Sequence, residues 1–358
     1  MSNDPRDLDG SRLRRALHLL GRDESLRRDL MEWLVRSESR FSKALAVRDD
    51  ITGPIIDALH DDADLYEKQL SDGTRFEFLY RTKIARDFLL SQPSSPDHVW
   101  EPQTTRLLCH LADASQADVL IGGAYFGDHA VLMGRRLLAA GRRVHCFEPN
   151  DAQRGMLIRN AALNALTNLD VHALGLWHES SQLLRLDGFD SFANAVPATD
   201  DQSGFQTITI DDYLARQGRQ LSVLMLDIEG AELQALKGAR RTLERDQPSV
   251  VFEVHRDYVD WSAGLESTEI CRLLSDLGYR LFAVRDFNTN QDMSGRRIEL
   301  VPASTAYLTG PPHGFNMLAV RQDLVLDPAA FSVVNGVSPK LLWHKDPALH
   351  HPKDQPKA

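Results

Sequence analysis

Cysteine is scarce in this sequence: Cys109, Cys146 and Cys271 are the only three in 358 residues, and they are widely spaced. An odd number of cysteines without a CxxC pair argues against a disulfide framework and against a thiolate zinc site. We therefore expect buried, reduced thiols in a cytoplasmic protein.

Long apolar runs and an excess of basic charge are also missing. No apolar stretch reaches the roughly 18 residues of a membrane span, and the apolar patch near the N-terminus is too short and too charged for a signal peptide. Asp and Glu outnumber Lys and Arg by 51 to 41, whereas proteins that bind nucleic acid usually carry a basic excess. We therefore expect neither a membrane span nor a nucleic-acid partner.

The first hundred residues show a mainly helical pattern. Apolar residues recur at helical spacing in two stretches between Leu13 and Leu34, and a further helix is expected over about 54–70. The turn SDGT then precedes a short strand in RFEFLY, and a loop rich in Pro and Ser follows at 91–102. This pattern predicts a helical N-terminal region over residues 1–100 that caps a second domain.

From about residue 103, apolar strand-like runs alternate with amphipathic helices, which is typical of a parallel sheet covered on both faces. The last strand follows the sixth without a clear helix, so we expect it to pair antiparallel. The predicted strands are Asp118–Ile121, Arg143–Phe147, Leu169–Leu174, Val223–Leu226, Val250–Val254, Arg280–Val284 and Asn316–Val320. The predicted helices are about 128–140, 151–165, 211–217, 230–245 and 266–277, with Asp128 and Asn150 as caps and Gly141 at a helix end.

The sequence thus predicts an α/β, Rossmann-like fold. Its sheet has seven strands, mostly parallel, with an antiparallel last strand. We assign this domain to residues 101–325 and a C-terminal tail to residues 326–358.

Glycines follow the first strand at the sheet edge where ligands bind in such folds. Gly122, Gly123 and Gly127 let backbone N–H groups approach a ligand closely. Glu148 ends the next strand, 21 residues after Gly127, where an acid can accept hydrogen bonds from ribose hydroxyls. The absence of GK[ST] excludes a P-loop, and the absence of GxGxxG argues against a dinucleotide. The pattern favours a ligand with an adenosine-like ribose.

Further polar side chains are expected at the same edge, because the other parallel strands end there and the antiparallel strand begins there. They are Asp227, Glu229, Glu253, His255, Arg256, His313 and Asn316.

Five motifs follow one another between about residues 117 and 255. They are the glycine-rich stretch DVLIGGAYFGDHA, then FEPNDAQRGMLIRNAALNAL, TITIDDYL, LDIEGAELQALKGARRTL and VVFEVH. In this order they resemble the FkbM family of S-adenosylmethionine-dependent methyltransferases. The resemblance covers neither the first hundred residues nor the tail after about residue 290.

One departure concerns the first motif, which in the family reads roughly DVGANxG. Here Ile121 and Tyr125 replace its Asp and Asn. The missing acid often helps to hold the methionine end of the cofactor, and Asp128 or Glu101 is a candidate replacement.

The resemblance implies a class I methyltransferase that moves a methyl group from S-adenosylmethionine to a hydroxyl of a sugar, a saccharide or a secondary metabolite. The implied cofactor-binding residues are Gly122, Gly123, Ala124, Tyr125, Gly127, Glu148, Pro149, Asn150 and Asp227. The hydroxyl must lose its proton, and a histidine is the usual base. The candidate catalytic residues are His255, His313 and Asp227, with His255 preferred because the family motif reaches it. The candidate acceptor-binding residues are Glu229, Glu253, Arg256 and Asn316.

Three alternatives stay open at this point. Mg²⁺ bound by Asp227 and Glu229 is one, but only these closely spaced carboxylates suggest it, so no metal ligand is assigned. An NAD-dependent oxidoreductase is disfavoured by the missing GxGxxG. A non-catalytic, cofactor-binding scaffold is disfavoured by the presence of Glu148 and Asp227. The sequence leaves the acceptor and the oligomeric state open, a homodimer included.

Overall fold

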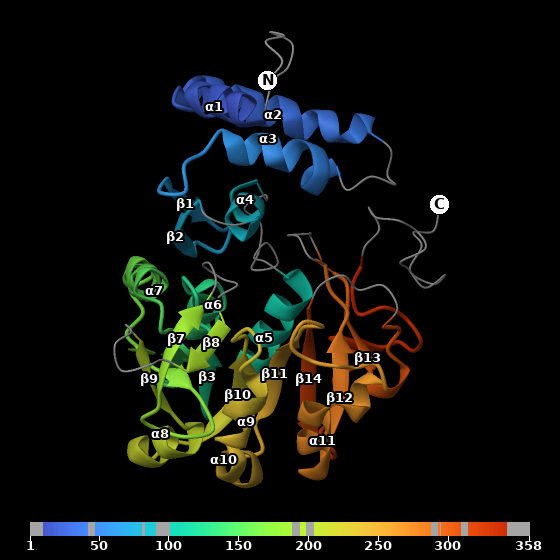
Figure 1. Ribbon diagram of the computed structural model, residues 1–358. Helices are drawn as coiled ribbons and strands as arrows, with labels where there is room; N and C mark the ends of the chain where they lie inside the picture. Colours follow the sequence, from blue (N-terminus) through green and yellow to red (C-terminus); the bar gives the residue numbers. More distant parts are fainter. Residues whose placement is uncertain are drawn as a thin grey trace.

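The computed structural model describes residues 10–41, 47–80, 83–90, 101–187, 194–197, 204–287, 293, 295–308 and 314–341. Figure 1 shows an N-terminal part, drawn in blue, that lies at one end of a larger α/β layer. Within the described ranges, no helix combines the length and the apolar character that crossing a membrane requires.

The N-terminal part contains a β-hairpin in addition to the predicted helices. Its elements are α1 (Gly10–Gly21), α2 (Glu24–Ser37), α3 (Gly53–Ala58), β1 (Leu65–Gln69), β2 (Arg75–Leu79) and α4 (Lys83–Leu90). The strand predicted in RFEFLY is confirmed. The helix predicted over 54–70 is wrong beyond Ala58. There the side chains of Asp61 and Asp64 accept the backbone N–H groups of Ala63 and Asp61, and such local bonds compete with a helix.

The hairpin is fastened to the α/β layer by aromatic packing and by two asparagines. Phe76 contacts Phe126, which follows β3, with ring centroids 6.3 Å apart. Asn160 on α7 (Asp151–Leu163) accepts the N–H of Glu77 at 2.7 Å. Asn164, the residue after this helix, accepts the N–H of Arg75 at 3.0 Å. Both asparagine side chains also donate to carbonyls of the same two hairpin residues. Asn160 and Asn164, the two asparagines of the stretch RNAALNAL, therefore pair with β2, the second strand of the hairpin.

The large sheet has nine strands in the order β15-β13-β12-β14-β11-β10-β3-β4-β5. Their bounds are β3 (Asp118–Gly122), β4 (Val144–Phe147), β5 (Leu169–His172), β10 (Leu221–Leu226), β11 (Ser249–Val254), β12 (Tyr279–Val284), β13 (Ile298–Pro302), β14 (Phe315–Arg321) and β15 (Phe331–Val333). All seven predicted strands lie in this sheet. As predicted, the last of them is antiparallel: β14 lies between β11 and β12 and runs opposite to both. The sequence analysis missed β13 and β15, which extend the sheet at its β12 edge.

Helices cover both faces of the sheet. Successive residues of a strand point to opposite faces of the sheet. Val119 and Ile121 pack on the face covered by α5, α6 and α7, and Leu120 packs on the face covered by α8 to α11. The helices are α5 (Pro102–Ala114), α6 (Asp128–Leu138), α7 (Asp151–Leu163), α8 (Ile210–Gln217), α9 (Glu232–Lys237), α10 (Arg240–Arg245) and α11 (Glu269–Asp276). The predicted helix over 230–245 is in fact two short helices, and Gly127 rather than Asp128 is the N-cap of α6. Asn150 caps α7 as predicted.

A second, smaller sheet lies between β5 and α8 in the sequence and was not predicted. It consists of β6 (Gly175–Leu176), β7 (Leu183–Asp187), β8 (Asn194–Pro197) and β9 (Phe205–Ile208).

The strand order reverses between β3 and β10. From β3 the chain proceeds outward through β4 to β5, then returns to the other side of β3 with β10 and continues to β11. In doubly wound sheets, ligands bind at the carboxyl ends of the strands at this switch point. We call the carboxyl end of β3, β4, β10 and β11 the rim.

The N-terminal part also contains a buried histidine whose ring is held neutral. His60 stacks on Tyr80 with centroids 4.0 Å apart, and its Nδ1 lies 2.6 Å from the hydroxyl of Tyr66. Burial first, and the charge of Arg27 second, lower the pKa of His60 from 6.5 to about 4. The unfolded chain therefore binds more protons than the folded chain between these two pH values.

We predict that His60 makes the fold sensitive to acid. The stability contributed by its neutral ring is complete above about pH 6.5 and is lost as the pH falls towards 4, by at most about 3 kcal/mol. Urea unfolding at pH 7.5 and 5.0 measures the loss. The loss is expected to be smaller in His60→Phe, which keeps an aromatic ring and cannot titrate, and unchanged in a variant of the exposed His178, His178→Asn. Equal losses in wild type and His60→Phe would contradict the prediction.

Candidate functional site

The glycine loop and the end of β10 touch each other at the switch point. Gly122 pairs with Leu226 in the sheet, and the N–H of Asp227 donates to the carbonyl of Gly122 at 3.1 Å. Gly123 has a φ of +74°, and a Cβ there would lie 1.7 Å from the carbonyl oxygen of Asp227. Only glycine fits this position. The two predicted ligand-binding segments are therefore in direct backbone contact.

The rest of the predicted loop turns tightly around this contact. Ala124 is buried, Tyr125 has a φ of +47°, and Gly127 has a φ of +94° at the N-cap of α6. Tyr125 packs on Phe126 with ring centroids 4.8 Å apart. Ile121, where the family has an acid, is buried in the apolar core, so it contributes no polar group to the rim.

Glu148 is held at the rim by backbone donors. Its two carboxylate oxygens accept the N–H groups of Tyr125 and Asn150, both at 2.9 Å. These two bonds fix the orientation of the carboxylate at the end of β4. The carbonyl of Pro149 accepts from Arg154 at 3.2 Å, and the side chain of Asn150 is used for capping α7. Among these residues, Glu148 is therefore the candidate for contacting a ligand with its side chain.

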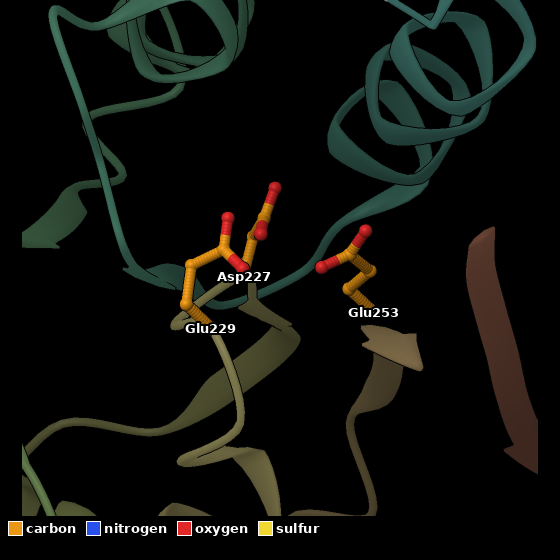
Figure 2. Close-up of side chains that lie close together, drawn as sticks. All are labelled: Asp227, Glu229 and Glu253. Carbon is orange, nitrogen blue, oxygen red and sulfur yellow. The ribbon is translucent and has the colours of Figure 1, made fainter. Parts of the chain in front are cut away.

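Three carboxylates converge at the ends of β10 and β11. Figure 2 shows the side chains of Asp227, Glu229 and Glu253 turned towards one another. One oxygen from each lies within 4.8 Å of the others. The sequence analysis placed all three at this edge but did not predict that Glu253 would join the other two.

The loop after β10 is shaped to bring Glu229 into this group. Glu229 has a φ of +50°, which costs a non-glycine residue free energy and is common at functional sites. Glu232 fixes the loop, because its carboxylate accepts the N–H groups of Ile228 at 2.8 Å and Gly230 at 3.0 Å. Glu232 therefore has a structural role at the start of α9.

Burial and mutual repulsion disfavour the ionised forms of these acids. Burial, followed by the charge of Glu101, raises the pKa of Asp227 to about 7. Burial and the charge of Asp227 raise the pKa of Glu229 to about 8 and that of Glu253 well above its ordinary value. Negative charge is thus crowded at the rim, and protons or a cationic ligand can relieve the crowding.

His255 follows β11 at the same rim. Its Nδ1 accepts the backbone N–H of Asp257 at 3.2 Å and lies 3.5 Å from the carboxylate of the same residue. Burial lowers the pKa of His255 below its ordinary value, so the ring is neutral at pH 7. Arg256 is exposed. His313 lies outside the described residues.

Asn316 and two residues without a clear sequence signal complete the rim. Asn316 lies opposite Glu253 in the antiparallel pair of β14 and β11, and its Nδ2 donates to Glu101. The ammonium of Lys340, which is 1% exposed, lies 2.9 Å from the other oxygen of Glu101. Glu101 was proposed from the sequence only as a replacement for the missing acid. Nothing in the local sequence marked Lys340, which lies in the predicted tail.

Two further acids line the same region but are already engaged. Asp286 accepts the N–H groups of Gln103 at 3.0 Å and Thr104 at 2.7 Å, and so caps α5. Asp128, the other suggested replacement for the missing acid, is buried beside His129, with 3.7 Å between Oδ2 and Nδ1.

The rim combines two neighbouring groups of residues that suit different ligands. The glycine loop with Glu148 presents backbone and carboxylate groups suited to a nucleoside. The ends of β10 and β11 present ionisable groups within a few ångströms of that loop, which suits proton transfer or cation binding.

The family comparison agrees with this location. Residues 122–281 match the family model described as the methyltransferase FkbM domain. No curated protein matches the chain.

Several solved methyltransferases resemble the chain at low identity. The methyltransferase FkbM from Methylobacillus flagellatus KT is 17% identical, with a TM-score of 0.32, over 57% of this chain and 43% of that one. The tRNA (uracil-54, C5)-methyltransferase from Pyrococcus abyssi, solved with S-adenosyl-L-homocysteine, is 14% identical, with a TM-score of 0.35, over 72% and 44%. An O-methyltransferase from Bacillus cereus, solved with the same compound, is 13% identical, with a TM-score of 0.35, over 63% and 84%. The chain spans less than half the length of the first two.

We predict that Gly123→Ala destabilises the fold by at least about 2 kcal/mol, because the added Cβ meets the carbonyl of Asp227. Gly141→Ala is the matched control. Gly141 also has a positive φ, +65°, but a Cβ there has no neighbour within 4 Å, so only the backbone strain remains. Urea unfolding of both variants separates the clash of the added Cβ from the backbone strain. Equal losses in the free energy of unfolding would refute the close contact.

Proposed function

The chain carries a methyltransferase FkbM domain at residues 122–281, and from this premise we propose that it is an S-adenosylmethionine-dependent O-methyltransferase. Its acceptor is a hydroxyl of a sugar, a saccharide or a secondary metabolite. The observation that carries the proposal is the contact between the glycine loop and Asp227, which joins a nucleoside-binding segment to a cluster of ionisable groups.

The residues at the switch point fit S-adenosylmethionine. The backbone at Gly122 and Gly123 lacks side chains where it approaches Asp227, and backbone N–H groups hold the carboxylate of Glu148 at the rim, where it can face the ribose hydroxyls. When bound, the cofactor supplies an electrophilic methyl group attached to a sulfonium. The crowded carboxylates at the end of β10 are suited to face that positive charge.

We assign to His255 the role of the general base, which accepts the proton of the acceptor hydroxyl. With S-adenosylmethionine bound, His255 would accept the hydroxyl proton on the unprotonated nitrogen of its neutral ring as the acceptor oxygen takes the methyl group from the sulfonium. The carboxylate of Asp257, 3.5 Å from Nδ1, would stabilise the protonated ring. Positioning of the two reactants supplies most of the remaining acceleration.

Acceptor binding is assigned to the groups around His255. Glu229, Glu253 and Asn316 lie at the same rim, and exposed Arg256 flanks them. The N-terminal hairpin contacts Phe126 within the glycine loop, so we assign the N-terminal part a share in selecting the acceptor. His313 stays a candidate base from the sequence.

We predict that Glu148→Ala abolishes cofactor binding. Isothermal titration of the wild type with S-adenosylmethionine and S-adenosylhomocysteine is expected to give micromolar binding, and the variant none, because the ribose loses its carboxylate. Glu266→Ala, at an exposed acid outside the glycine loop and the FEPN segment, is expected to bind like the wild type. Binding of NAD in place of both compounds would refute the proposed function.

We predict that His255→Asn lowers kcat by about 100-fold or more, the usual contribution of a general base. The dissociation constant of S-adenosylmethionine is expected to stay within about twofold of the wild-type value, because His255 lies outside the glycine loop. Steady-state kinetics with an accepted hydroxyl substrate gives kcat, and titration gives the dissociation constant. His178→Asn, at an exposed position, serves as the control. An unchanged kcat in His255→Asn would exclude His255 as the base.

A further inference from the structure

The three converging carboxylates at the rim have a geometry suited to one metal ion. Asp227 and Glu229 follow β10, and Glu253 ends β11, so the group is built from two neighbouring strands. Their oxygens lie within 4.8 Å of one another, as Figure 2 shows. Oxygens bound to one Mg²⁺ or Ca²⁺ stand roughly 3–5 Å apart, since metal–oxygen distances are about 2.0–2.6 Å.

The charge of this group has no direct counterpart in the described protein. Lys340, the buried ammonium of the rim, is paired with Glu101, and Glu232 is satisfied by backbone N–H groups. Among the described residues, no lysine or arginine forms an ion pair with Asp227, Glu229 or Glu253. Such a group is costly unless a cation or protons neutralise it.

A second observation, independent of the acids, points to the same ligand. Asn316 is 2% exposed, and its Nδ2 donates to Glu101, which fixes the orientation of the amide. Its Oδ1 is buried and has no hydrogen-bond donor among the described residues. Asn316 is paired with Glu253 across β14 and β11, so the two side chains project from the same face of the sheet at neighbouring positions.

A buried amide oxygen without a donor, on the residue paired with Glu253 across the sheet, adds a further hard oxygen ligand to the three carboxylates. Carboxylate and amide oxygens are the donors that Mg²⁺, Mn²⁺ and Ca²⁺ prefer, whereas softer metals prefer nitrogen and sulfur. No described histidine or cysteine belongs to the set. We propose that Asp227, Glu229, Glu253 and the Oδ1 of Asn316 bind a divalent hard cation.

The consequence for catalysis rests on the proposed function, whereas cation binding does not. A cation at this position would lower the pKa of an acceptor hydroxyl that binds to it. The proton would then pass to His255 more readily.

The test is titration of the EDTA-treated full chain with MnCl₂ at pH 8, without methyl donor or acceptor, followed by the electron paramagnetic resonance signal of free Mn²⁺. One Mn²⁺ is expected to bind per chain and to be displaced by Mg²⁺ or Ca²⁺. Glu253→Gln is expected to weaken Mn²⁺ binding at least tenfold, while the exposed control Glu266→Gln binds like the wild type.

Thermal melting shows that a loss of binding is not a loss of fold. Mn²⁺ is expected to raise the melting temperature of the wild type and of Glu266→Gln, and to leave that of folded Glu253→Gln unchanged. Absence of Mn²⁺ binding to the folded wild type, or equal binding by wild type and Glu253→Gln, would overturn the proposal. Mn²⁺ binding with no binding of S-adenosylmethionine would uphold the cation site while refuting the proposed function. If the chain binds no Mn²⁺ but its methyl transfer is undiminished in EDTA, the cation site would be refuted and the proposed function upheld.

Discussion

The rim depends on the backbone contact between Gly123 and Asp227. A parallel sheet brings the ends of β3 and β10 to the same edge, but ordinary side chains would hold the two following loops apart. Glycine at position 123 removes that obstacle, and the carbonyl of Asp227 occupies the space of the missing Cβ. The glycine loop and the ionisable groups after β10 are consequently placed within one site, as the proposed methyl transfer to an adjacent hydroxyl requires.

A second constraint is the distribution of buried charge. Glu101, at the start of α5, and Lys340, near the end of the described chain, form an ion pair that also holds Asn316 through the second oxygen of Glu101. This pair links three segments that are distant in sequence. It also uses the buried ammonium, so that Asp227 and Glu253 are left with neither a lysine nor an arginine partner in the described ranges. The structure therefore pairs Glu101 with an ammonium and leaves Asp227 and Glu253 without one among the described residues.

The sheet was largely predictable from the sequence, because its strands are continuous apolar runs whose period differs clearly from that of the flanking helices. The antiparallel β14 followed from the absence of a crossover helix before it. By contrast, β1 was read as helix, since LYEKQL carries too few apolar residues to separate the two periods, and the turn made by Asp61 and Asp64 was overlooked. Strand β15 is three residues long and gives no periodic signal.

The candidate site was predictable only in part, for a related reason. Position at a strand end is a local property, and it correctly placed Glu148, Asp227 and Glu253 at the rim. The Lys340–Glu101 pair joins residues 239 positions apart, so no local pattern could reveal it. The orientation of Asn316 depends on that pair, and its donor-free oxygen is visible only in three dimensions.

The stretch RNAALNAL shows how far the domain extends beyond the segment that carries the family signature. Asn160 donates to the carbonyl of Phe126 at 2.8 Å and to that of Glu77 at 2.9 Å, so a single side chain joins the glycine loop to the N-terminal hairpin. Asn164 adds a second pair of bonds to the same strand. These amides satisfy backbone groups that an unpaired strand edge would otherwise expose. The hairpin is thus bonded to the glycine loop through Asn160, so a displacement of either one is transmitted to the other.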